Sequence, residues 1–166
     1  MAENSFHLPR WEELPDFPIY IDQVIYYVEQ HLSMLYYNEE KFITNSMINN
    51  YVKSGIVEAP IKKKYERGQV AYIIIICILK KAYTLDEITQ LFDVQIKTFE
   101  TERAYNYFCS EFENCLYSII NKDDIEHIPS DSDMKDVVYL LHNTVLAVTH
   151  KIYVQYLLDQ KNKNQD

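Results

Sequence analysis

The sequence predicts an all-α protein, and three observations carry that prediction. Only two glycines, Gly55 and Gly68, occur among 166 residues, whereas β-sandwiches and barrels need glycine at many tight turns. Hydrophobic residues make up 48% of the chain, which is enough for a substantial core. Apolar residues also recur at spacings of three and four over several long segments, which is the period of an amphipathic helix.

The first segment, residues 1–19, is expected to be an extended lead-in, because Pro9, Pro15 and Pro18 each disfavour helix at the preceding residue. Trp11 and Phe17 are expected to anchor this lead-in to the body. Helices are then predicted over about 20–37, 44–53, 67–82, 84–92, 97–121 and 133–160. A loop or hairpin is predicted over 58–66, and a frayed polar tail over 161–166.

Local signals fix several of these boundaries. Thr44 or Asn45 can cap the second helix, and Gly55 suits the left-handed position just past its end. Thr84 and Glu87 form a capping box that opens the fourth helix. The run from Ala71 to Leu79 contains four consecutive isoleucines, which favour a strand by propensity. Because the run continues without a turn signal, we predict a buried helix instead. Residues 130–133 supply caps for the last helix.

Charge is distributed unevenly along the chain, whose net charge is −9. Between residues 44 and 81 there are seven basic residues and two acidic ones, a net charge of +5, so the remainder carries −14. The simpler interpretation is a solvated surface on which basic residues cluster by chance. The alternative is one basic face on an acidic body, as a nucleic-acid-binding protein would show.

Three consecutive pieces of this basic segment favour DNA recognition. The helix near residues 44–53 has a polar outer face, and asparagine in such a helix can pair with adenine edges in the major groove. A lysine-rich loop with a tyrosine follows it, and a buried helix follows the loop. We expect Asn49, Asn50 and neighbours to contact bases and the loop cations to contact phosphates. The candidate DNA-binding residues are Asn45, Asn49, Asn50, Lys53, Lys62, Lys63, Lys64, Tyr65 and Arg67.

These pieces resemble the MerR family of bacterial regulators. The segment Ile48–Val57, INNYVKSGIV, is similar to the family's recognition helix and its glycine-terminated turn. Lys63–Tyr65 resembles the basic-basic-tyrosine of its wing, and Tyr83–Ile88, YTLDEI, resembles the opening of its next helix. The resemblance implies a winged helix-turn-helix core over residues 20–95, preceded by the 1–19 lead-in and followed by a helical region over 96–160 and the tail.

Nearly the whole chain resembles a second bacterial group, the domain-of-unknown-function 1836 family. The residues that carry this resemblance are Leu8–Trp11, Leu14–Pro15, Tyr20–Val24, Met47–Lys53 and Lys62–Tyr65. This resemblance implies a regulator-like protein.

Other classes of function find little support. His142 and His150 lie eight residues apart, two helical turns, which is too far to chelate one ion, and no cysteine lies at ligand spacing to either. We therefore predict no metal site and no cofactor. Nucleophile motifs are absent as well, so no enzyme is expected. The three cysteines are expected to be free thiols in the core of a protein from a reducing, cytoplasmic compartment. No apolar run reaches the length of a membrane span.

The sequence thus predicts a DNA-binding transcriptional regulator with double-stranded DNA as partner and an unknown effector. The alternative is a protein-interaction module that kept the winged-helix scaffold and lost DNA contact. The last helix has two apolar stripes, one of which suffices for its own core. The second stripe predicts a homodimer, and its residues are Val137, Leu140, Ala147, Val154 and Leu158.

Overall fold

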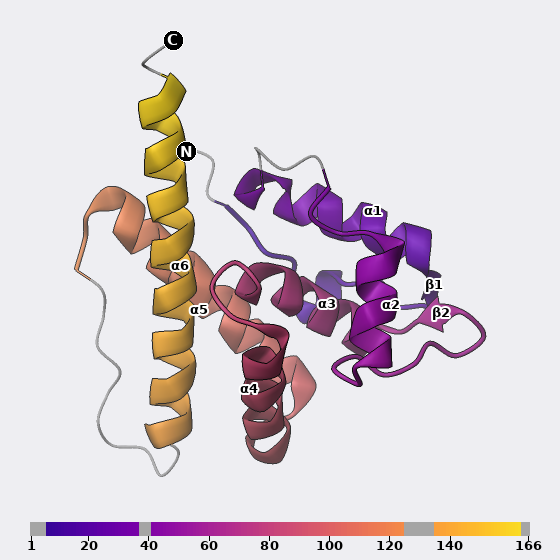
Figure 1. The fold of residues 1–166 in the computed structure, drawn as a ribbon. Helices are drawn as coiled ribbons and strands as arrows, with labels where there is room; N and C mark the ends of the chain where they lie inside the picture. The colour runs from indigo at the N-terminus through magenta and orange to yellow at the C-terminus, as the bar shows by residue number, and fades with distance from the viewer. Residues whose placement is uncertain (1–5, 37–40, 125–134, 164–166) are drawn as a thin grey trace.

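The computed structural model describes residues 6–36, 41–124 and 135–163. The chain is mainly helical, as predicted, with six α-helices and one small two-stranded sheet among the described residues. Figure 1 shows the long helix α6 (Lys135–Lys163) standing at one edge, crossed by α5 (Thr101–Asn121). The sheet and α2 (Asn45–Lys53) lie at the opposite edge.

The lead-in docks onto α5 through a short 3-10 helix, η1 (Trp11–Glu13). The Trp11 ring packs edge-on against Tyr105, 6.3 Å between ring centres, so its predicted role as an anchor is confirmed. Phe17 is 62% exposed, and its predicted role as an anchor is wrong. The buried apolar side chains of the lead-in are instead Leu8, Leu14 and Ile19.

The first predicted helix ends earlier than its apolar stripe suggested. Helix α1 covers Ile21–Leu32, and the chain then tightens into the 3-10 helix η2 (Ser33–Leu35). This turn places Tyr36 in the core, where its ring stacks on Phe42 and its hydroxyl donates to the carbonyl of Cys77. The core contact therefore overrides the helical pattern after residue 32. The remaining predicted position, residue 37, lies outside the described residues.

The isoleucine run forms the buried helix α3 (Arg67–Leu79), as predicted over 67–82. Eight of its residues are buried, so it is the central helix of a single apolar core. Residues 80–82 continue as hydrogen-bonded turns rather than helix. The helix α4 (Leu85–Thr98) begins at the predicted Thr84–Glu87 capping box but runs six residues beyond the predicted end.

The small sheet joins the lead-in to the predicted loop at 58–66. Strand β1 (Ile19–Tyr20) pairs antiparallel with β2 (Lys64–Tyr65), with Ile19 opposite Tyr65. Immediately before β2, Ile61 and Lys64 exchange two backbone hydrogen bonds of 3.1 and 2.9 Å across a two-residue turn. The predicted loop is thus a hairpin, and the strand that precedes α1 extends it.

The first apolar stripe of α6 packs on the core, with Val145, Val148 and Ile152 buried. Helix α6 continues through Lys163, so the predicted polar tail is helical over its first three residues. The predicted caps at 130–133 lie outside the described residues. Within the described ranges, no helix combines the length and the apolar character that crossing a bilayer requires.

Candidate nucleic-acid interface

Helix α2 presents a polar face to solvent. Thr44 caps it, accepting a hydrogen bond of 3.2 Å from the backbone N–H of Met47, and Gly55 follows its end with a φ of +80°. Ile48 and Tyr51 are buried against the core. Asn49 and Asn50 are therefore turned outward and exposed, because residues one and two positions from a buried one lie on other helix faces.

The other two predicted positions on α2 differ in their side-chain contacts. Lys53, in the last turn, is exposed. Asn45 is exposed as well, but its amide contacts the carboxylate of Asp22 at 3.4 Å. A carboxylate at this end of α2 would repel a phosphate that approached Asn45. Asp22 precedes α2 by more than twenty residues, so no spacing in the sequence predicts its contact with Asn45.

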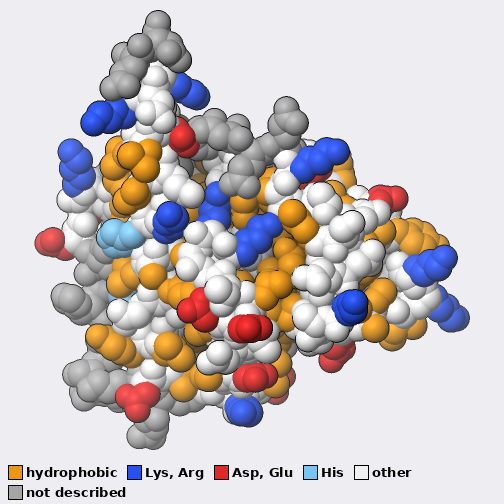
Figure 2. All heavy atoms as spheres, in the orientation of Figure 1, with side chains coloured by type: hydrophobic (Ala, Val, Ile, Leu, Met, Phe, Trp, Pro, Cys, Tyr) orange, Lys and Arg blue, Asp and Glu red, His pale blue; other side chains and the backbone are white. Residues whose placement is uncertain are grey.

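The hairpin carries its lysines at the tip. Lys62 and Lys63 have φ angles of +49° and +65°, so both occupy the left-handed region. This is the backbone of a tight two-residue hairpin turn, in which asparagine and glycine are usual. Both side chains are exposed. Figure 2 shows the cluster of Lys and Arg side chains at this edge of the molecule.

Lys64 lies at the base of the hairpin, with its ammonium 5.0 Å from the centre of the Tyr20 ring. A chain of contacts therefore connects the hairpin to α2, since Tyr20 precedes α1 directly and Asp22, in its first turn, touches Asn45. Helix α2 and the hairpin accordingly lie at one edge of the molecule (Figure 1).

Two predicted phosphate contacts are placed differently. Tyr65 is only 2% exposed, because β2 alternates its side chains and turns this ring into the core. Burial raises the pKa of the Tyr65 hydroxyl, and the structure withdraws this side chain from the surface at which a phosphate would lie. Arg67 lies against the lead-in, where its Nε donates to the carbonyl of Pro15 at 3.4 Å and its guanidinium covers the Trp11 ring.

A further lysine approaches α2 from α3. The ammonium of Lys80 donates to the carbonyl of Phe42 and lies 3.9 Å from the sulfur of Met47 in the first turn of α2. It adds positive charge near the N-terminal end of α2, opposite in sign to Asp22. The sequence placed Lys80 in the basic segment without linking it to α2, because only the fold brings the end of α3 beside this helix.

A small-molecule effector would need a pocket in the described part of the molecule. The cavity enclosed by α3, α4, α5 and α6 has a volume of about 40 Å³ and an apolar lining that includes Ile75 and Phe108. Small-molecule sites usually measure roughly 300–1,000 Å³, so this cavity is too small. A hollow of about 470 Å³ lies instead between α4 and the segment that leads into the hairpin.

Comparison with known proteins gives one family. The model of the domain of unknown function (DUF1836) matches residues 9–108, from the lead-in through α5 as far as Phe108. No curated protein and no solved structure matches the chain. The match covers more than half of the 166 residues, and it includes both α2 and the hairpin. The chain therefore belongs to the DUF1836 family.

Proposed function

We propose that this protein binds double-stranded DNA and regulates transcription, through a MerR-like winged helix-turn-helix core in which α2 enters the major groove and the 61–65 hairpin is the wing. The observation that carries the proposal is the pairing of an exposed polar helix face with two lysines at a hairpin tip. Asparagines can read adenine edges, while lysines neutralise phosphates beside the groove.

The exposure and charge of each residue decide whether it is assigned to a base or to a phosphate. Asn49 and Asn50 are assigned to bases, whereas Lys53, Lys62 and Lys63 are assigned to phosphates. Asn45 is secondary, because Asp22 occupies its amide and adds an opposing charge. Replacing Asp22 with asparagine would remove that charge and should strengthen binding to every duplex.

Selection of bound duplexes from a random pool tests this assignment first, followed by titration of a selected duplex over a salt series. The logarithm of affinity should fall linearly with the logarithm of salt, and each lost phosphate contact should reduce the slope by roughly 0.9. Lys62→Ala should weaken all duplexes alike, whereas Asn49→Ala should relax the preference at particular base pairs. Lys122→Asn, at the exposed left-handed residue just after α5, is the matched charge control and should change neither quantity.

The alternative function is protein interaction on the same scaffold. Its support is the charge of −14 carried outside residues 44–81, which opposes a polyanion. Absence of binding to any duplex at low salt, together with wild-type folding, would reject DNA binding and leave this alternative.

A homodimer through α6 completes the proposal. Leu140, Val154 and Leu158 of the second apolar stripe are 40%, 49% and 56% exposed, and Ala147 is exposed as well. Figure 2 shows hydrophobic side chains along this helix. The monomer core leaves them in solvent, and a second copy of the chain would cover them while doubling the DNA contact.

A further inference from the structure

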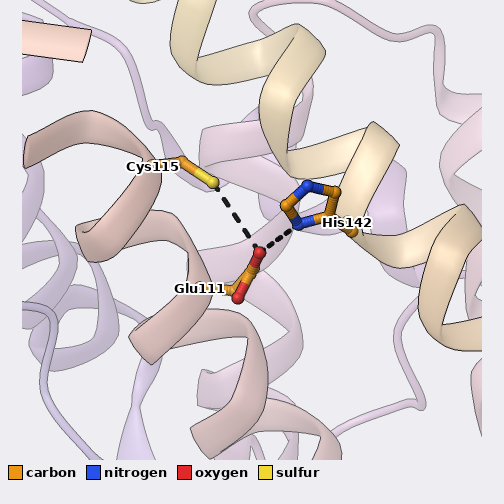
Figure 3. A group of neighbouring side chains, drawn as sticks. All are labelled: Glu111, Cys115 and His142. Carbon is orange, nitrogen blue, oxygen red and sulfur yellow. Dashed lines mark hydrogen bonds and ion pairs between the residues drawn. The ribbon is translucent and has the colours of Figure 1, made fainter. Parts of the chain in front are cut away.

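Three potential metal ligands meet between α5 and α6. Glu111, Cys115 and His142 bring one carboxylate oxygen, one sulfur and one imidazole nitrogen within 4.8 Å of one another. Figure 3 shows the Glu111 carboxylate between the other two side chains. Its Oε1 accepts a contact from the Cys115 thiol at 3.8 Å and pairs with Nδ1 of His142.

The packing of α5 against α6 brings these three side chains together. Glu111 and Cys115 are four residues apart on α5, so they occupy the same face one turn from each other. His142 comes from the face of α6 that packs on α5, three residues before the buried Val145. No spacing in the sequence connects His142 with the other two, so the absence of a cysteine at ligand spacing from a histidine gives no sign of this group.

The site is largely withdrawn from water. Cys115 is 2% exposed, and the side chains of Glu111 and His142 are 18% and 8% exposed. His142 is the one ion-pair partner of Glu111 in the described part of the chain. Burial of a carboxylate is costly unless positive charge lies beside it. A divalent cation bound at this group would add positive charge next to Glu111.

Sulfur, imidazole nitrogen and carboxylate oxygen together are the donors that zinc-type ions prefer. Ligands at 2.0–2.3 Å from a tetrahedral ion lie roughly 3.3–3.8 Å from each other, so small side-chain rotations would bring the three donors into place. We propose that Glu111, Cys115 and His142 bind a divalent transition-metal ion of the zinc type, which ties α5 to α6. Water completes the fourth position, on the side where Glu111 reaches solvent.

Two other interpretations of the same residues are outcomes of the test. A nucleophilic cysteine would need its thiol on the imidazole and a lowered pKa. Here the thiol faces Glu111, and burial together with the charge of Glu111 raises the pKa of Cys115 to about 12. The second interpretation is a hydrogen-bonded trio that closes the helix interface and binds no metal.

The experiment titrates the untagged, reduced full-length protein with Co²⁺ as a spectroscopic probe. One equivalent should produce a thiolate-to-cobalt charge-transfer absorption and intense visible bands of a tetrahedral ion, and Zn²⁺ should abolish both by displacement. Cys115→Ser should remove the charge-transfer absorption. Glu111→Gln and His142→Gln should each weaken Co²⁺ binding by roughly 10–100-fold or more, at least the loss seen for outer-shell partners.

Matched controls lie on the same helices. Glu102→Gln on α5 and His150→Gln on α6 replace exposed side chains of the same types as the site residues and should leave the titration unchanged. His7→Gln tests a competing surface group, in which the imidazole contacts Glu13 and Glu113 at 2.9 and 3.4 Å. Loss of the cobalt spectrum in the His7 variant alone would overturn the proposal, because it would move the ion to the surface.

Thermal unfolding keeps the test decisive if a variant folds poorly. Zn²⁺ should raise the Tm of the wild type, since a ligand that binds the folded state stabilises it, and should not raise that of Glu111→Gln. A wild-type protein that shows neither the charge-transfer absorption nor a Tm shift would establish the hydrogen-bonded trio and overturn the metal site. Rapid alkylation of Cys115 in the native protein would overturn it in favour of a reactive thiol.

Discussion

Arg10 and Glu113 form a two-point ion pair although 103 residues separate them. The guanidinium donates from Nη1 to Oε1 at 2.8 Å and from Nη2 to Oε2 at 2.5 Å. The backbone N–H of the buried Leu8 donates to the same carboxylate at 2.6 Å. This carboxylate on α5 therefore fixes the position of the lead-in, which in turn supplies β1 to the hairpin. The lead-in is an integral part of the fold.

Replacing this carboxylate should destabilise the whole chain. Glu113→Gln removes the charge that faces a partly buried guanidinium, and the hydrogen bond that Arg10 donates to Glu113 is the main cause that raises the pKa of Arg10. We expect a loss of about 2 kcal/mol in the free energy of unfolding, measured as a lower urea midpoint with an unchanged slope. The same substitution at Glu12, an exposed position of η1, should cost less than about 0.5 kcal/mol. Equal effects of the two would mean that the ion pair contributes little.

The hairpin tip allows stability and DNA binding to be separated. Lys62 and Lys63 occupy left-handed backbone, where residues other than glycine and asparagine are strained. The double variant Lys62→Asn, Lys63→Gly should therefore raise the free energy of unfolding by about 1 kcal/mol. The same variant should weaken DNA binding and lower the salt slope by roughly 1.8, because two phosphate contacts disappear.

The control for this variant keeps both charges. Lys62→Arg, Lys63→Arg should retain the salt slope and the wild-type stability, since backbone strain and charge are unchanged. If the asparagine–glycine variant is more stable and binds DNA as well as the wild type, the hairpin does not touch phosphate and the wing assignment is wrong.

Much of the fold could be predicted because its signals are local. The Thr84–Glu87 box, Gly55 after α2 and the uninterrupted isoleucine run each depend on neighbours within a few residues, and each is found as predicted. The exposure of Asn49 and Asn50 follows from the same helical period. Where a segment follows the period of a single helix, its structure can be predicted from the sequence alone.

The errors share one physical cause, which is contact between distant segments. Helix α1 ends at Leu32 because Tyr36 finds a place in the core against Phe42 and α3. Tyr65 is buried because β2 pairs with β1, a strand that the sequence analysis treated as lead-in. The Glu111–Cys115–His142 group likewise depends on how α5 and α6 pack, and no pattern within either helix reveals it.

The capping box predicts a pH dependence of stability. The backbone N–H and hydroxyl of Thr84 donate to the Glu87 carboxylate at 2.8 and 3.0 Å and lower its pKa below the ordinary value. A lowered pKa in the folded state stabilises the protein above the unfolded-state pKa, near 4.3, and this contribution is lost as the pH falls through the folded-state value. The difference in Tm between wild type and Glu87→Ala should therefore be constant from pH 7 to about 5 and shrink below that.

Asp93 provides the comparison for Glu87, because it is exposed in the middle of the same helix. Calorimetry of Asp93→Ala should show a Tm difference from wild type that does not narrow below pH 5 in the same way. A Tm difference for Glu87→Ala that stays constant down to pH 3 would show that the charged form of Glu87 does not stabilise the cap.

The exposed stripe of α6 predicts a homodimer. Helix α6 has 29 residues, about 43 Å at 1.5 Å per residue, and this length allows contact from Leu140 to Leu158. Because these side chains are already in solvent in the monomer, Val154→Asp with Leu158→Asp should prevent association without unfolding the chain. Light scattering at micromolar concentration should give twice 19.8 kDa for the wild type and 19.8 kDa for this variant.

Circular dichroism separates the interface from the core. The double aspartate variant should keep the wild-type helical signal, whereas Val148→Asp, at a position with 0% exposure, should unfold the chain because it buries an unpaired charge. Tyr26→Asp, at a 66% exposed aromatic on α1, controls for an added surface charge and should leave the dimer intact. A wild-type mass of 19.8 kDa would reject the dimer. A dimer that survives both substitutions would show that its interface lies away from this stripe. Another surface would then have to join the two copies and double the DNA contact.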